Sequence, residues 1–290
     1  MAASTSDAAN LLNLVNKTLE LPTLPEVLLK LNEVMAKPES SVDDVARVIS
    51  TDPAVSTNIL RLVNSSYYGL KVRVSTVGLA VSIMGFTMTR KVALKAAVFS
   101  RFAKKGAGFD QFDPESFWRH SIFTGVAART LGSECGRFAS MHSEDLYTCG
   151  LLHDIGKILL FEKLPERYAE LLGLAASTGR SETDTETEML GFSHSDVGSV
   201  LAIKWSLPED LAVGIRYHHQ PGQDQFHRAL SSLIHLADHL AWSAGFPSTK
   251  VPSTARLDAS IYDDVGLDPR DVEDLLPQIR EDYEAVGLPW

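Results

Sequence analysis

The sequence has few cysteines and few basic residues, and each shortage excludes a class of protein. Only two of its 290 residues are cysteine, too few for a disulfide framework, which favours a reducing cytoplasm. Lysine and arginine number 27 against 37 aspartate and glutamate residues, and the net charge is −10. Because phosphate backbones attract clustered basic side chains, this balance argues against a general nucleic-acid or membrane-surface binder.

Targeting and membrane signals are also missing. Residues 1–7 contain no basic region followed by an apolar run, so we expect no secretory signal peptide. We find no apolar run long enough to cross a bilayer, no internal repeat and no low-complexity tract. The apolar share of 44% is ordinary for a globular protein with a core. We therefore expect a cytoplasmic globular protein.

Helical patterns run through almost the whole chain, without a convincing set of alternating strands. Apolar residues between positions 24 and 35 recur at i, i+3, i+4 and i+7, the spacing of one helix face. Ser41 with Asp44 is typical of a capping box, and Asp52-Pro53 is typical of a helix start. These signals predict an all-α fold.

Polar and glycine-rich stretches indicate how the chain is divided. Residues 106–114 are typical of a joint, and the polar stretch 177–188 links two helices, with Thr183 and Glu186 as a cap. Residues 244–255 are rich in proline, serine and threonine, which is typical of a loop. Three regions are therefore predicted: an N-terminal helical lobe over 1–115, a second helical lobe over 116–245 that contains all the histidines, and a loop with an acidic helix over 246–290.

The histidines are confined to one part of the chain. All nine lie between His120 and His239. The pair His153-Asp154 ends an apolar run in the stretch Leu-Leu-His-Asp-Ile-Gly-Lys. A neutral imidazole beside a carboxylate offers the mixed nitrogen and oxygen ligands that divalent transition metals accept.

Helical phase predicts which of these side chains point inward. Five residues continue the apolar faces of five different helices: His120, His153, His194, His218 and Asp238. An aspartate on such a face is costly unless it is paired or bound to a cation. His219 lies about 100° around the helix from its neighbour and is ambiguous. The remaining four are predicted at the surface or rim: His142, His227, His235 and His239.

Two interpretations of the inward set stay open at this point. A single histidine on an apolar face is usually a hydrogen-bonded core residue, and an inward aspartate is usually a cap or half of a buried pair. Five such residues on five helices favour a shared metal or ligand site. The alternative is an ancestral site that now holds only a hydrogen-bond network.

The sequence resembles a known superfamily at these same residues. His120, His153-Asp154 and Asp238 match the H…HD…D pattern of the HD phosphohydrolases. Shorter stretches resemble the HDOD family, the HD-related output domain: residues 21–25, 48–53, 62–69, 80–85, 205–208 and 218–221. The resemblance covers roughly residues 18–245. It implies an all-α, multi-helix HD-superfamily bundle with an N-terminal helical subdomain.

The resemblance also implies a metal centre of one or two divalent ions. One ion would be held by His120, His153, Asp154 and Asp238. A second, bridged by Asp154, would be held by His194, His218 and His219. Fe, Mn, Ni or Zn suit such mixed ligands. Asp154 and Lys157 are implied as catalytic residues, with Lys157 facing a phosphate as a point charge.

Many HDOD proteins are non-catalytic bacterial signalling modules, so three functions are open. The first is a regulatory protein with a metal site that acts on partners in trans: kinase, receiver or cyclic-dinucleotide proteins. The second is a metal-dependent phosphohydrolase acting on a nucleotide or cyclic dinucleotide, which would bind a phosphorylated small molecule. The third is a non-catalytic adaptor with an empty site. The related HD-GYP phosphodiesterases follow the paired histidines with a glutamate and a Gly-Tyr-Pro loop, whereas here Gln220 follows and that loop is missing.

Overall fold

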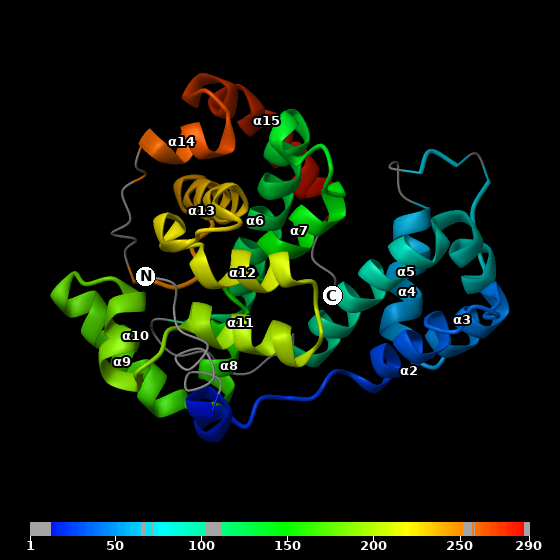
Figure 1. The fold of residues 1–290 in the computed structure, drawn as a ribbon, viewed down its shortest axis with the longest axis horizontal. Helices are drawn as coiled ribbons and strands as arrows, with labels where there is room; N and C mark the ends of the chain where they lie inside the picture. Colours follow the sequence, from blue (N-terminus) through cyan, green and yellow to red (C-terminus); the bar gives the residue numbers. More distant parts are fainter. Residues whose placement is uncertain are drawn as a thin grey trace. The chain divides into compact units, whose positions relative to one another are not determined.

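The computed structural model is helical throughout the part of the chain that it describes, and no β-strand occurs there (Figure 1). The all-α prediction is therefore confirmed. The described residues are 13–64, 68–70, 72–102, 112–251, 257 and 259–286. Most of the predicted joint over 106–114, and the end of the predicted loop over 244–255, lie outside them.

The α-helices follow one another along the chain with short connections. Their bounds are α2 Glu26–Met35, α3 Val42–Ile49, α4 Pro53–Val63, α5 Val77–Phe102, α6 Pro114–Glu134, α7 Ser143–Leu152, α8 Ile155–Lys163, α9 Pro165–Thr178, α10 Glu182–Leu190, α11 His194–Lys204, α12 Glu209–Tyr217, α13 Arg228–Ser243, α14 Ala259–Val265 and α15 Pro269–Val286. Two short 3-10 turns, η1 Gly136–Phe138 and η2 Pro221–Gln223, lie between them.

The chain forms two compact units. The smaller unit spans residues 23–104 and contains α2 to α5. Its helices start where the sequence predicts: the Ser41 and Asp44 capping box is present, and the Asp52 carboxylate accepts from two backbone N–H groups at the start of α4. Fully buried apolar side chains, among them Leu31 and Ile49, form its core.

Contrary to the expectation from the sequence, one helix, α5, is long and apolar enough, by length and composition, to cross a membrane. Gly85 interrupts it with φ 71° and ψ 168°, a backbone conformation that glycine adopts readily. Residues on both sides of this kink, including Ala80 and Ala93, belong to the core of the smaller unit. We therefore interpret α5 as a core helix.

The larger unit contains residues 1–22 and 105–288. Helix α6 is buried along most of its length and packs against α7, α13 and α15. Gly150 of α7 allows the close approach of α7 to α6, since a Cβ atom there would lie 2.7 Å from the Thr124 carbonyl oxygen. Helices α8 and α12 both pack against α11. This arrangement brings the ends of α7 and α12 to the middle of the unit.

Candidate metal centre

The structure gathers all eight residues that the sequence analysis assigns to the site. They come from six helices or helix ends of the larger unit: His120 in α6, His153 and Asp154 between α7 and α8, Lys157 in α8, His194 at the start of α11, His218 and His219 after α12, and Asp238 in α13. Six of the eight are at least 97% buried, Asp238 is 8% exposed, and His219 is part-exposed.

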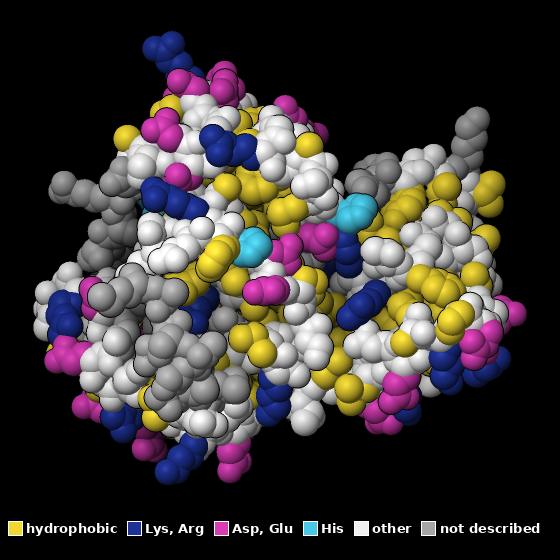
Figure 2. All heavy atoms as spheres, in the orientation of Figure 1, with side chains coloured by type: hydrophobic (Ala, Val, Ile, Leu, Met, Phe, Trp, Pro, Cys, Tyr) yellow, Lys and Arg dark blue, Asp and Glu magenta, His cyan; other side chains and the backbone are white. Residues whose placement is uncertain are grey.

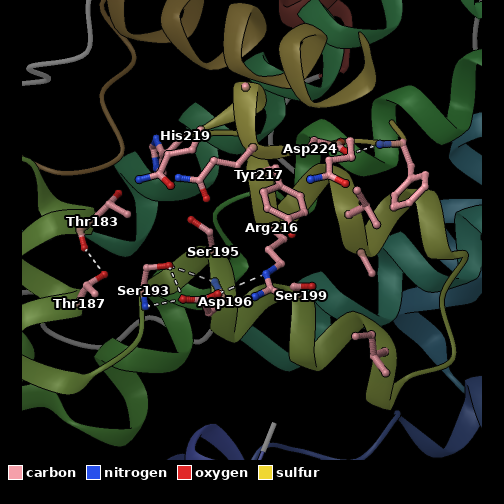
Figure 3. A pocket seen from close by; sticks show the side chains of 18 of the residues that line it. Thr183, Thr187, Ser193, Ser195, Asp196, Ser199, Arg216, Tyr217, His219 and Asp224 are labelled. Carbon is pink, nitrogen blue, oxygen red and sulfur yellow. Dashed lines mark hydrogen bonds and ion pairs between the residues drawn. The ribbon is translucent and has the colours of Figure 1, made fainter. Parts of the chain in front are cut away.

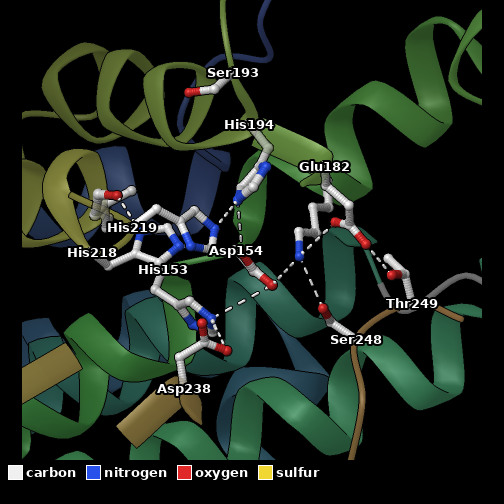
Figure 4. Close-up of polar contacts among 12 residues, drawn as sticks. His153, Asp154, Glu182, Ser193, His194, His218, His219, Asp238, Ser248 and Thr249 are labelled. Atoms are coloured by element: carbon white, nitrogen blue, oxygen red, sulfur yellow. Dashed lines mark hydrogen bonds and ion pairs between the residues drawn. The ribbon is translucent and has the colours of Figure 1, made fainter. Parts of the chain in front are cut away.

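Asp154 lies at the centre of this group, with its two carboxylate oxygens facing different histidines (Figure 4). Oδ1 lies 3.1 Å from His194 Nε2 and 3.5 Å from His218 Nε2. Oδ2 lies 3.5 Å from His153 Nε2 and 3.7 Å from His120 Nε2. One carboxylate thus stands between two sets of imidazoles, as a bridging ligand would.

Asp238 and His219 complete the two sets. Asp238 Oδ1 lies 3.1 Å from His120 Nε2 and 3.7 Å from His153 Nε2. His219 Nε2 lies 2.9 Å from His194 Nε2. Two groups result whose potential ligand atoms lie within 4.8 Å of one another: His120, His153 and Asp238, and Asp154, His194, His218 and His219.

Backbone carbonyl groups fix the orientation of three of these imidazoles. His120 donates from Nδ1 to the Phe246 carbonyl at 2.7 Å, and His153 and His218 donate in the same way at 2.6 Å within their own helix ends. A carbonyl can only accept, so in each neutral ring the proton is on Nδ1 and the lone pair is on Nε2. All three Nε2 atoms point to the centre, in the orientation typical of metal-bound histidine.

Without a cation, these lone pairs would face one another. The Nε2 atoms of His120 and His153 are 3.3 Å apart. Among the described residues, Asp154 Oδ1, Asp238 Oδ1 and His218 Nε2 are buried at ion-pair distance but without hydrogen-bond geometry. Buried polar atoms are normally satisfied. The donor set therefore fits divalent metal ions.

Glu186 orients the fourth inward histidine. The Glu186 Oε2 atom lies 2.6 Å from His194 Nδ1 and also accepts from the His194 backbone N–H at 2.7 Å. Both side chains are fully buried. A carboxylate that holds the outer nitrogen of a histidine raises its basicity as a ligand and fixes the ring. Glu186 therefore positions His194 Nε2 toward Asp154.

Burial and neighbouring charges give these groups different protonation states. Burial lowers the pKa of His218 to about 4, and it holds the pKa of His219 well below its usual range, with the His218 and His194 charges acting in the same direction. Burial opposes protonation of His194 too, but the Glu186 carboxylate raises its pKa to about 10. Burial likewise works against ionisation of Asp154, yet the Lys157 ammonium and His153 keep its pKa well below normal. The carboxylate is thus ionised and two imidazoles are neutral at pH 7.

Lys157 lies between two carboxylates and a hydroxyl group. Its Nζ atom lies 2.8 Å from Asp154 Oδ2, 3.0 Å from Glu182 Oε2 and 2.9 Å from the Ser248 hydroxyl. Thr249 in turn donates to Glu182. The ammonium group thus makes one hydrogen bond, to Ser248, and two close ion pairs with buried carboxylates. Its predicted role toward a phosphate stays a prediction, and in this structure Lys157 neutralises Asp154 and Glu182.

Gly156 explains why a glycine stands within the His-Asp-Ile-Gly-Lys stretch. A Cβ atom on Gly156 would lie 1.9 Å from the His194 carbonyl oxygen and 2.7 Å from its carbonyl carbon. Backbone atoms cannot rotate away as a flexible side chain can. Glycine therefore permits α8 and α11 to approach until His194 reaches Asp154.

Two predictions about this region are wrong. His235, predicted at the surface or rim, is 7% exposed, and its Nδ1 donates to the His218 carbonyl at 2.7 Å. His235 thus holds the backbone of His218, a candidate metal ligand. The predicted linker over 177–188, with its cap of Thr183 and Glu186, is also wrong. Residues 182–190 form α10, Ser181 caps that helix, and Glu186 turns inward to the metal centre.

Glu182 and Glu186 were not predicted as site residues, because they lie in a polar stretch that carries no apolar face. Their four-residue spacing, which puts both on one face of a helix, was the available clue. With His194 they form a third group of potential ligands.

Comparison with known proteins supports the family resemblance. The model of the HDOD domain matches residues 21–221 of this chain. A curated but uncharacterised protein from Treponema pallidum (strain Nichols) is 28% identical over 220 residues, which are 76% of this chain and 42% of the relative. The chain thus spans less than half of that relative's length.

Solved structures show the same fold. A protein of Marinobacter aquaeolei VT8, provisionally assigned to signal transduction, superposes with a TM-score of 0.74 at 22% identity, over 97% of this chain and 64% of the other. A provisionally assigned phosphohydrolase of Shewanella amazonensis SB2B gives a TM-score of 0.68 at 25% identity, over 94% of this chain and 98% of the other. Both likenesses extend along nearly the whole of the present chain.

Proposed function

Because the chain belongs to the HDOD domain family, we propose that it is a bacterial regulatory protein whose His/Asp centre binds divalent transition-metal ions and whose output is contact with partner proteins. One observation carries the metal part: three histidines with fixed Nδ1 protons direct their Nε2 lone pairs at two ionised carboxylates in a buried space. The proposed location is the cytoplasm.

The residues that would hold the metal are those of the two groups. His120, His153 and Asp238 form one position, His194, His218 and His219 form the other, and Asp154 faces both. Bound ions in such a centre supply Lewis acidity toward a phosphoester oxygen. Fe, Mn, Ni and Zn all accept these ligands, and the number of ions is one or two.

The chain's own residues favour regulation over hydrolysis. The Lys157 ammonium, which a phosphate would need, is occupied by Asp154, Glu182 and Ser248. Gln220 stands where the active HD-GYP relatives have a glutamate. Six of the eight site residues are almost wholly buried, which leaves a phosphorylated substrate little direct access to them.

A metal-dependent phosphohydrolase is the second candidate, and a specific observation favours it. All seven candidate ligands lie in the two groups that could hold a metal ion, and the 25%-identical Shewanella protein is provisionally assigned as a phosphohydrolase. In this function Asp154 and Lys157 would act as the catalytic residues. Substrates of this class are nucleotides and cyclic dinucleotides.

Two measurements separate these functions. Elemental analysis after reconstitution with Mn, Fe, Ni or Zn counts bound metal, and Asp154→Asn is the matched variant because it keeps the side-chain shape. A screen of nucleotides and cyclic dinucleotides then tests hydrolysis. Metal bound without turnover supports the regulatory function, and turnover lost in Asp154→Asn supports the phosphohydrolase. Protein that binds no metal under any of these conditions contradicts both.

A further inference from the structure

A long groove runs beside the metal centre within the larger unit. It has a volume of about 1430 Å³ and lies along α10, α11, α12 and the turn that follows η2 (Figure 3). His219 is the one metal-centre residue that lines it, within the part of the chain that the structure describes. A molecule in the groove would therefore lie next to one of the candidate ligands.

The groove has a surplus of acidic groups. Five carboxylates line it, against two guanidinium groups. Each guanidinium is already compensated: Arg180 pairs with Glu188, and Arg216 Nε lies 3.6 Å from Asp196 Oδ1. The remaining carboxylates belong to Asp184, Glu209 and Asp224.

These three carboxylates are not all equally available. Asp224 accepts two backbone N–H groups and the Ser231 hydroxyl, so it stabilises the turn. Asp184 and Glu209 pair with no cation among the described residues. A polyanion such as a cyclic dinucleotide would be repelled here, whereas a lysine or arginine would be attracted.

Exposed apolar side chains lie in the same groove. Phe226 is 86% exposed and Ile203 is 57% exposed, and both belong to its lining. The face in Figure 2 shows acidic and apolar side chains next to one another on this unit. Exposed aromatic and aliphatic groups beside charged ones are typical of a surface that binds another protein.

A buried hydroxyl group also faces the groove without a partner. Ser195 lines the groove, is 2% exposed, and its Oγ atom has no hydrogen-bond partner among the described residues. A hydroxyl can both donate and accept, so it suits a backbone carbonyl or N–H of a bound peptide. Ser195 thus marks a position for the main chain of a ligand.

From these three features we propose that the groove binds a polypeptide segment of a partner protein that carries lysine or arginine beside apolar side chains. The proposal rests on the proposed regulatory function and names the partner's chemistry. The basic side chains would pair with Asp184 and Glu209, and the apolar ones would contact Ile203 and Phe226. The peptide backbone would bond to Ser195 and lie next to His219.

Fluorescence anisotropy with the metal-reconstituted 290-residue chain tests this directly. The probes are a labelled synthetic peptide of alternating lysine and leucine, a matched glutamate and leucine peptide, and cyclic diguanylate. We expect the basic peptide to bind and the other two not to. Glu209→Lys should weaken binding about tenfold, because it replaces an attraction with a repulsion. Phe226→Ala should weaken it about fivefold, since it removes an exposed apolar contact.

The matched control is Glu281→Lys, an exposed residue of α15 away from the groove lining. It makes the same change of charge, so it measures general attraction to an acidic protein. Hydrogen exchange of the complex should show protection over residues 182–226, the segment that contains the proposed contacts. Any of four results would overturn the proposal. The first two are equal weakening by Glu209→Lys and Glu281→Lys, and protection elsewhere in the chain. The other two are absence of peptide binding, and cyclic diguanylate bound in the groove.

Metal content of the same samples keeps the two proposals distinguishable. If the protein binds metal but the groove variants bind the peptide as tightly as the wild type does, only the groove proposal is overturned. Protein that takes up no metal overturns the proposed metal-dependent function, whatever the peptide does.

Discussion

Replacing Gly156 by alanine should break the contact that assembles the metal centre. The added Cβ atom would lie 1.9 Å from the His194 carbonyl oxygen, whereas ordinary contact begins at 3.4 Å, so the two helices must separate by about 1.5 Å. A displacement of that size would also remove His194 Nε2 from its 3.1 Å contact with Asp154. The variant should therefore lose both stability and metal affinity.

A second glycine separates the cost of the steric clash from the effect of helix propensity on stability. Gly173 lies within α9, and a Cβ atom there has nothing within 4 Å. Alanine at that position should stabilise the protein by about 0.5–1 kcal/mol, because glycine loses more backbone entropy on folding. Alanine at position 156 gains the same propensity but adds overpacking, which typically costs about 1–3 kcal/mol. We expect Gly156→Ala to be less stable than Gly173→Ala by about 1–3 kcal/mol, the overpacking cost alone.

Urea unfolding followed by tryptophan fluorescence measures this difference. Trp118, Trp205 and Trp242 all lie in the larger unit, so their emission reports on the unit that holds the site. Metal affinity is measured on the same two variants by titration with Mn. If Gly156→Ala unfolds at the same urea concentration as Gly173→Ala and binds metal as tightly as the wild type, the steric reasoning is wrong.

Three further predictions concern the groups around Asp154. Glu186→Gln should weaken metal binding about 10- to 100-fold without unfolding the chain, since it removes the charge that orients His194; unchanged affinity in a Mn titration would contradict this role. Because the pKa of His194 is raised to about 10, the metal-free protein keeps it protonated at pH 7.5, and metal binding should release that proton and weaken as the pH falls. Calorimetry in buffers of different ionisation enthalpy counts the protons, and a count of zero would refute the assignment. Lys157→Met should destabilise the metal-free protein by about 3–5 kcal/mol in urea, because it leaves the Asp154 and Glu182 carboxylates buried without their cation; a loss below about 1 kcal/mol would show that the pair contributes little.

The sequence was sufficient for the residues that lie on apolar helix faces. His120, His194 and Asp238 each continue a buried stripe, and an ionisable group in such a position needs a partner, so their convergence could be expected. The capping signals before α3 and α4 are local, and they were also predicted correctly.

Contacts that depend on the tertiary arrangement could not be found in this way. Glu186 lies on a short polar helix, and only the packing of α10 beside α11 brings it to His194. His235 shares its helix face with polar residues, yet the end of α12 covers it and supplies the His218 carbonyl. The role of Gly156 depends on how closely α8 and α11 approach each other, and helical periodicity does not describe that distance.

Counting the metal in the reconstituted protein tests the central claim most directly. Wild-type protein, loaded with Mn, Fe, Ni or Zn and freed of excess ions, is compared with Asp154→Asn by elemental analysis. The account predicts one or two equivalents of metal in the wild type and a marked loss in the variant, because Asp154 faces both groups of ligands. Wild-type protein that retains no metal, or a variant that retains as much as the wild type, would contradict it.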